Sequence, residues 1–238
     1  MSEWAQKRFW KDVSLGEADG GFQVLLDGRG VRTPAKAAQI IPTRALAEAV
    51  AAEWDAQVET VDPGAMPLTR LTNSAIDKVT VQFSEVADSL AAYGGSDLLC
   101  YRASTPAELV ARQGAAWDPL LAWAADTLAA PLETATGVMF VSQPEASLKA
   151  LSDRVHGLTP FELAAFHDLV ALSGSLVMAF AAIEKQAAPE EAWSWSRIDE
   201  DWQAEQWGED EEAAEVAAIK RGEFLLAHRT FELVRDPT

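Results

Sequence analysis

The pattern of hydrophobic positions changes its period along the chain, from strand-like alternation in the first forty residues to helical spacing after them. Residues 22–26, a turn at 27–30 and residues 31–33 predict a β-hairpin, because the Asp-Gly pair in the turn supplies the two positive-φ positions that a tight connection needs. Residues 40–42 predict a short edge strand. Apolar residues then recur every four positions, which predicts an amphipathic helix over 44–58.

The remainder of the chain predicts helices almost throughout. A helix over 68–93 is ended by Gly94-Gly95, where the composition also changes. The later expected elements are helices over 106–115, 117–129, 145–155, 159–185 and 211–231, with an extended run at 136–141. We therefore expect an α+β protein with two domains. Residues 1–94 form a small domain with β-hairpins and helices, and residues 95–238 form a larger all-α domain.

The net negative charge of the chain excludes some classes of binding partner. The chain carries 37 acidic and 19 basic side chains, a net charge of -18, within an apolar fraction of 49% that is ordinary for a globular protein. Such a chain repels the phosphate backbone of nucleic acids and the anionic surface of membranes. No apolar run reaches the length of a membrane helix, and the first residues lack the pattern of a signal or transit peptide. We expect a monomeric protein of the bacterial cytoplasm, with no stable membrane association.

The most unusual stretch is an acidic tract at 190–215, which holds eleven acids, one base and four tryptophans. On a helix, Trp195, Ile198 and Trp202 share one face, and a second face carries acids only. The acids of that face are Asp201, Glu205, Glu209 and Glu212. Like charges at this spacing destabilise a helix slightly, so helix stability does not explain the pattern. Three interpretations stay open: a solvated face backed by tryptophans, a surface for a basic protein partner, or a carboxylate metal site.

The sequence contains few of the motifs that enzymes use for catalysis or for binding a cofactor. No Glu-x-x-His pair accompanies the acidic tract, so we expect no metal ion and no other cofactor. Cys100 lies among apolar residues that suppress thiol reactivity, and no phosphate-binding loop occurs. We expect no catalytic residue. The alternative is a carboxylate-dependent hydrolase that uses Asp199, Glu205 and Asp210 in the 199–212 segment.

Motifs spread along nearly the whole chain resemble the Atp-twelve family, the assembly chaperones of the catalytic head of F-type ATP synthase. The stretches that carry the resemblance are 25–29, 33–34, 52–57, 66–70, 97–102, 113, 117–119, 199–203 and 205–210. In eukaryotes the members of the family are found in the mitochondrial matrix, and this chain is similar to the alphaproteobacterial members. The resemblance implies a small N-terminal α+β domain followed by an orthogonal helical bundle.

The resemblance also implies a function and a partner. The chain would be a non-enzymatic chaperone that binds the unassembled alpha subunit and shields its beta-facing surface until beta replaces the chaperone. We expect the acidic tract to contribute to that binding, with Glu205 first. The other candidates are Asp201, Glu209, Glu212, Trp202 and Trp207, with Trp54 and Arg70 outside the tract. A general chaperone without a fixed client is the remaining alternative, and Trp54 is interpreted either as a core anchor or as a recognition aromatic.

Overall fold

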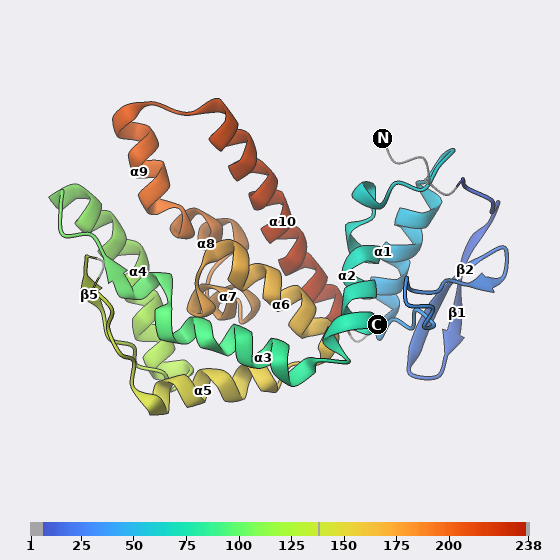
Figure 1. The fold of residues 1–238 in the computed structure, drawn as a ribbon, viewed down its shortest axis with the longest axis horizontal. Coiled ribbons are helices and arrows are strands. Elements are labelled where there is room, and N and C mark those ends of the chain that lie inside the picture. Colours follow the sequence, from blue (N-terminus) through green and yellow to red (C-terminus); the bar gives the residue numbers. More distant parts are fainter. Residues whose placement is uncertain (1–6, 138, 237–238) are drawn as a thin grey trace. The chain divides into compact units, whose positions relative to one another are not determined.

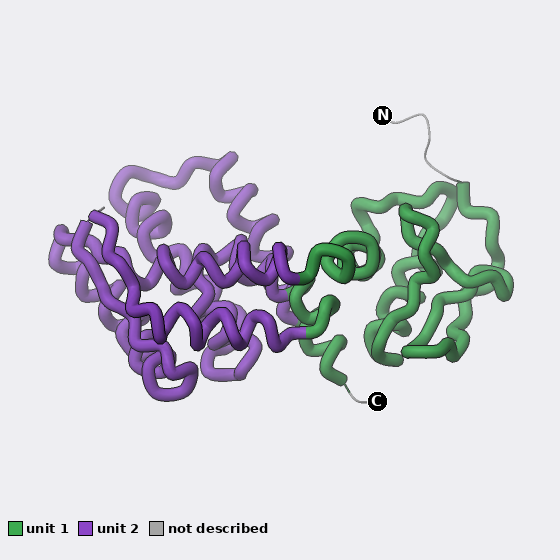
Figure 2. The backbone as a smooth tube through the Cα atoms, turned by 60° about the horizontal axis from the view of Figure 1, so that its bottom comes forward, with its two compact units in different colours: residues 1–83, 159–165, 229–238 green, residues 84–158, 166–228 purple. Residues whose placement is uncertain are grey.

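The fold is described from a computed structural model, in which residues 7–137 and 139–236 are placed (Figure 1). Two compact units make up the chain (Figure 2). Unit 1 consists of Met1–Phe83, Thr159–Ala165 and Arg229–Thr238, and unit 2 consists of Ser84–Leu158 and Phe166–His228. This division differs from the expected domains 1–94 and 95–238, because two later segments join unit 1. The single boundary after residue 94 stays a prediction.

Unit 1 contains a three-stranded antiparallel sheet in the order β1-β2-β3. The strands are β1 (Val13–Ala18), β2 (Gly21–Leu26) and β3 (Arg29–Gly30). Asp27 and Gly28 connect β2 to β3 with φ values of 50° and 77°, so the predicted tight turn is confirmed. The longer hairpin, between β1 and β2, lies within the first forty residues, whose pattern predicts β structure without giving the bounds of β1.

The expected edge segment at 40–42 lies against β2. The backbone groups of Phe22 and Ile41 exchange two hydrogen bonds of 2.8 Å each. Gly21 permits this approach: its φ is 153°, and an added Cβ would lie 2.1 Å from the carbonyl oxygen of Ile41. A glycine is therefore required where the chain enters β2.

Helix α1 (Arg44–Asp55) packs against β1 and β2 and buries Leu46 and Val50 completely. Thr43 caps it, since the Thr43 hydroxyl accepts a hydrogen bond from the backbone N–H of Leu46. The predicted helix over 68–93 is formed as a short helix, a π-helical stretch and a further helix. These elements are α2 (Pro67–Ser74), η2 (Ala75–Val79) and α3 (Phe83–Ala91), preceded by η1 (Pro63–Ala65).

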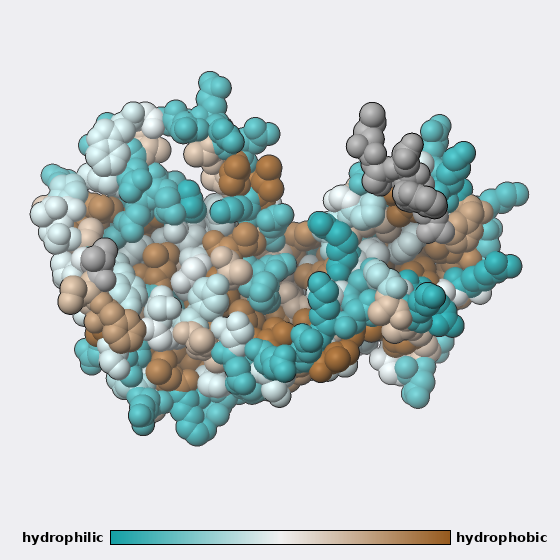
Figure 3. Space-filling model, in the orientation of Figure 1, coloured by the Kyte–Doolittle hydropathy of each residue, from teal (hydrophilic) through white to brown (hydrophobic). Residues whose placement is uncertain are grey.

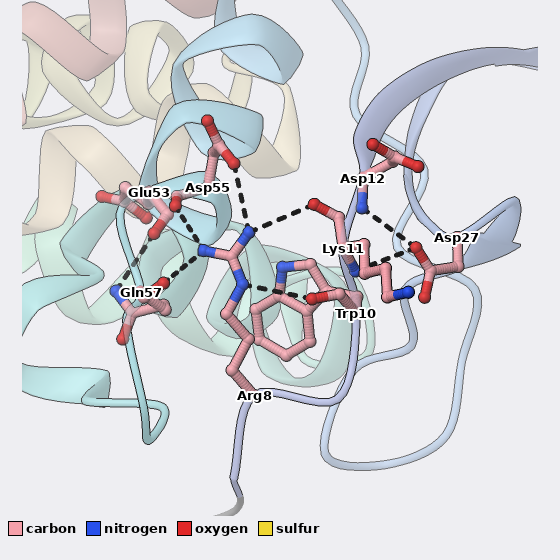
Figure 4. A network of polar contacts seen from close by, with 8 residues as sticks. All are labelled: Arg8, Trp10, Lys11, Asp12, Asp27, Glu53, Asp55 and Gln57. Atoms are coloured by element: carbon pink, nitrogen blue, oxygen red, sulfur yellow. Dashed lines mark hydrogen bonds and ion pairs between the residues drawn. The ribbon is translucent and has the colours of Figure 1, made fainter.

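Two charged side chains fix the C-terminal half of α1 within unit 1. Arg8 donates hydrogen bonds to the carbonyl oxygens of Asp55 (2.7 Å), the last residue of α1, and of Gln57, two residues beyond the helix (Figure 4). Glu53 accepts hydrogen bonds of 2.7 Å from the backbone N–H groups of Leu68 and Thr69. A carboxylate at this position satisfies free donors at the start of α2 and complements the helix dipole.

Unit 2 is largely helical, and its helices surround the apolar segment α7 (Leu176–Ile183), in which every residue is buried. Its remaining elements are helices apart from one short parallel strand pair, β4 and β5. The elements are η3 (Ala92–Ser96), η4 (Leu98–Cys100), β4 (Tyr101–Arg102), α4 (Ala107–Thr127), β5 (Ala135–Thr136), α5 (Glu145–His156), α6 (Pro160–Ser173), α8 (Pro189–Ser196), α9 (Ile198–Trp207) and α10 (Glu211–Arg235). Of these, α6 and α10 each contribute residues to both units.

Two predicted helix boundaries are wrong. Helix α4 is continuous through Pro119, whereas two helices were expected there. Burial of Trp117 and Leu120 on either side holds the segment helical despite the missing N–H group. Conversely, the expected helix over 159–185 is interrupted at Gly174, whose φ is 70°, and α7 begins again after Ser175.

The interruption between α6 and α7 is held by one buried carboxylate. Asp97 accepts hydrogen bonds from the Ser175 hydroxyl (2.7 Å) and from the backbone N–H groups of Val177 and Leu99 (both 3.0 Å). Complete burial raises the pKa of Asp97, which these three donors oppose. Asp97 thereby ties the segment before β4 to the N-terminus of α7.

Cys100, which lies three residues after Asp97, is part of the buried core of unit 2. It is fully buried, and burial raises the pKa of its thiol to about 12. The expected suppression of thiol reactivity is therefore supported by its environment.

Candidate protein-binding surface

The acidic tract does not form one helix. It contains α8, α9 and the first residues of α10, with breaks at Arg197 and at Gly208, whose φ is 96° (Figure 1). The expectation that four acids share one helical face is therefore wrong: Asp201 and Glu205 lie on α9, whereas Glu209 lies in the connection and Glu212 on α10. The expected face of Trp195, Ile198 and Trp202 is likewise divided between α8 and α9.

Helix α4 holds α8 and α9 through buried polar contacts. Trp117, which is fully buried, donates a 2.9 Å hydrogen bond from its indole N–H to the carbonyl oxygen of Trp195. The buried amide of Gln113 donates to a carboxylate oxygen of Asp199 (2.6 Å) and accepts from the backbone N–H of Ala103 (2.8 Å). These bonds set the position from which α9 begins.

Glu205 is paired within the protein. Its two carboxylate oxygens each accept a 2.8 Å hydrogen bond from the guanidinium of Arg112 on α4. That guanidinium also lies 5.1 Å from the centre of the Trp202 ring, within the range of a cation–π contact. The Arg112 hydrogen bonds lower the pKa of Glu205. Glu205 therefore orients α9 as well as contributing negative charge.

The other acids of the surface lack such a partner. Within the described residues, no cation forms an ion pair or hydrogen bond with Asp201, Glu209 or Glu212, and all three are exposed. Partial burial raises the pKa of Asp201; the charge of Arg197 opposes this rise, the charge of Glu205 adds to it, and the charge of Arg112 also opposes it. We call Asp201, Glu209, Glu212 and the neighbouring Trp207 the acidic surface.

Trp207 is the largest exposed aromatic of this region, with 81% of its surface accessible, whereas Trp202 is half-buried beneath Arg112. An indole so exposed contributes little to the stability of its own fold. Among the predicted aromatics of the tract, Trp207 is thus available to a partner, and Trp202 serves to position α9.

The two candidates outside the tract both belong to unit 1. Trp54 is half-buried, and its ring meets that of the buried Trp10 edge-on at 5.3 Å, so it packs as a core anchor at the margin of the unit. Arg70 on α2 is exposed. Neither residue belongs to the acidic surface.

The residues of the alternative hydrolase each have a structural partner. Asp199 binds Gln113, Glu205 binds Arg112, and Asp210 caps α10 by accepting hydrogen bonds from the backbone N–H groups of Glu212 (2.9 Å) and Ala213 (3.0 Å). Over residues 7–137 and 139–236, no group of three or more histidine, cysteine or acidic side chains has the geometry of a metal site. In the same residues no helix is both long and apolar enough to cross a bilayer.

Arg112 is a site residue that reasoning about the tract missed, whereas Gln113 is among the positions that carry the family resemblance but had no role assigned to it. Arg112 and Glu205 are separated by 93 positions, and nothing in the local pattern of either segment indicates that they pair. Gln113 is a polar residue on the buried face of α4, and that placement is the signal by which it could have been found.

The fold and surface are typical of a class of protein, the non-catalytic protein-binding modules: a largely helical unit presents exposed carboxylates and an exposed tryptophan. The family model described as "ATP12 chaperone protein" matches residues 7–125. Two solved structures of Atp12 from Paracoccus denitrificans are similar over nearly their whole length. One is an aspartate-to-lysine variant (TM-score 0.95, 48% identity, 98% of this chain and 100% of that one), and the other covers 97% and 99% with a TM-score of 0.94 and 48% identity.

A mitochondrial relative is more distant. The protein atp12 of Schizosaccharomyces pombe is 26% identical over 222 residues, which cover 88% of this chain and 76% of that protein. The chain belongs to the ATP12 chaperone family. It is a chaperone of ATP synthase assembly, of a family that is not enzymatic. The predicted α+β fold with a largely helical C-terminal region is confirmed.

Proposed function

We propose that the chain binds the unassembled alpha subunit of the ATP synthase catalytic head through the acidic surface. It covers the face of alpha that later packs against beta, and it leaves when beta takes its place. We propose further that it acts as a monomer in the bacterial cytoplasm. Membership of a family of ATP synthase assembly chaperones supports a client from that enzyme.

The physical need for such a chaperone lies in the client. A subunit interface without its partner is a large exposed apolar patch, and such patches aggregate. A chaperone has only to cover the patch reversibly, with an affinity below that of the final subunit contact. Charge complementarity suits this task, because it speeds encounter and fixes orientation more than it adds affinity.

One observation carries the proposal: Asp201, Glu209 and Glu212 are exposed and form no ion pair within the described residues, and Trp207 is exposed in the same region. A carboxylate whose two oxygens are both held by one guanidinium, as those of Glu205 are, is less available to a second cation. Asp201, Glu209 and Glu212 are not held in this way, so a basic side chain of the client can bind them without breaking an existing ion pair.

The test compares two charge reversals of equal size. Asp201→Lys changes the acidic surface, and Glu85→Lys changes an exposed acid of α3 in the same unit, for which the described part of the chain provides no ion-pair partner. We expect Asp201→Lys to weaken binding of purified alpha subunit at least roughly tenfold, and Glu85→Lys to leave it within about twofold. Equal affinities for both variants and the wild type would contradict a role for the acidic surface.

A further inference from the structure

Helices α9 and α10 are consecutive but are not packed together where they join. A hollow of about 470 Å³ lies between them, and Figure 3 shows it as an opening in the surface. Ala204 and Trp207 line it from α9, and Ala213, Ala214 and Ala217 line it from α10. The wall formed by α10 therefore carries small side chains, whereas the wall formed by α9 has one alanine and the Trp207 indole among polar residues.

The wall formed by α10 continues a core-facing stripe. Ala213, Ala217 and Phe224 follow one another at spacings of four and seven, which places them on one side of the helix. Phe224 is fully buried, whereas Ala213 is exposed and Ala217 is half-buried. The side of α10 that packs onto the protein at Phe224 is thus less covered about two to three turns earlier.

The lining of the hollow is strongly negative. Glu200, Asp201, Glu209 and Asp210 line it, and the one cation of the lining is Arg197, which is held 2.8 Å from Glu200. An occupant with basic side chains would be attracted, and an acidic one would be repelled.

We propose that this hollow receives one helix of the client, with small apolar residues on its buried face and lysine or arginine at its edges. Small side chains let two helix backbones approach to the short end of the usual 8–10 Å range, and a third helix between α9 and α10 would cover the alanine walls. Laying an amphipathic helix into a groove between helices is a recurrent mode of protein recognition. The inference rests on the proposed function and specifies how the client is held.

The groove can be blocked without changing its charge. Ala217→Trp places an indole in the hollow, and Ala218→Trp places the same indole on an exposed neighbouring position outside it. Ala213→Trp blocks the same wall from an exposed position, and it replaces Ala217→Trp if that variant melts below the wild type. Binding of purified alpha subunit is measured for each by isothermal titration calorimetry.

We expect the variants that block the hollow to bind alpha at least roughly tenfold more weakly than the wild type, and Ala218→Trp to bind within about twofold of it. Unchanged affinity of the blocked variants would overturn the inference while leaving the proposed function standing. No binding of alpha by the wild type would instead refute the proposed function. A wild-type dimer that becomes monomeric in Ala217→Trp on sedimentation would overturn the inference by identifying a second copy as the occupant.

Discussion

Replacing Gln113 by leucine tests whether α4 determines the position of the acidic helix α9. The change keeps a buried side chain of similar length but removes both of its hydrogen bonds. The backbone N–H of Ala103 loses its 2.8 Å acceptor, and the carboxylate of Asp199 loses its 2.6 Å donor.

The magnitude follows from those two lost partners. A buried polar group left without a partner costs about 1–3 kcal/mol. Ala103 and Asp199 are only half-buried, so each belongs near the lower end of that range, and the added apolar burial of leucine offsets part of the sum. We expect a net destabilisation of about 2 kcal/mol, which lowers the melting temperature of a chain of this size by roughly 4–8 °C.

Urea unfolding followed by circular dichroism measures the effect. Gln206→Leu, an exposed glutamine on α9, is the matched control and should stay within about 0.5 kcal/mol of the wild type. Asp199→Asn keeps an oxygen that accepts from Gln113 and should also be mild. If Gln113→Leu proved as stable as Gln206→Leu, the contact between α4 and α9 would not hold the surface in place.

Three further changes test other parts of the account. Trp54→Arg puts a charge against the ring of Trp10 and should destabilise the protein by about 2–3 kcal/mol, so an unchanged thermal midpoint would remove Trp54 from the core of unit 1. Glu205→Lys should weaken alpha binding with only a small change in melting temperature, since its pair with Arg112 is exposed; a large fall in melting temperature would show a mainly structural role. Burial of Glu162 opposes its ionisation, but hydrogen bonds from Thr159 and Arg235 outweigh this and lower its pKa. These hydrogen bonds stabilise the fold above the ordinary glutamate pKa of about 4.3, and the stabilisation is lost as the pH falls through the lower pKa of the folded state. The difference in unfolding free energy between wild type and Glu162→Gln should therefore shrink in acid. A difference that does not change with pH would contradict the pairing.

The sequence predicts well those features that depend on neighbouring residues. The Asp27-Gly28 turn, the cap at Thr43 and the helix that follows each depend on a few adjacent positions, and all are confirmed. Sequence reasoning failed where distant residues decide. Pro119 predicts the start of a helix, yet burial of Trp117 and Leu120 keeps α4 continuous through it.

The candidate site shows the same limit. Counting charges along 190–215 predicts an acidic region, but it cannot distinguish a paired acid from an unpaired one. Glu205 stood first among the candidates, and its partner Arg112 lies on another helix, 93 positions away. The break at Gly208, which separates Glu209 and Glu212 from the face of Asp201, follows from a positive φ that the helical spacing of the acids obscured.

The central claim is that this chaperone holds the alpha subunit until beta replaces it. Size-exclusion chromatography of the chain with freshly refolded alpha subunit tests it most directly, with unrelated aggregating proteins as controls and with beta subunit added afterwards. We expect a complex with alpha alone, which disappears when beta is added. Absence of a complex with alpha, or equal complexes with the unrelated proteins, would contradict it.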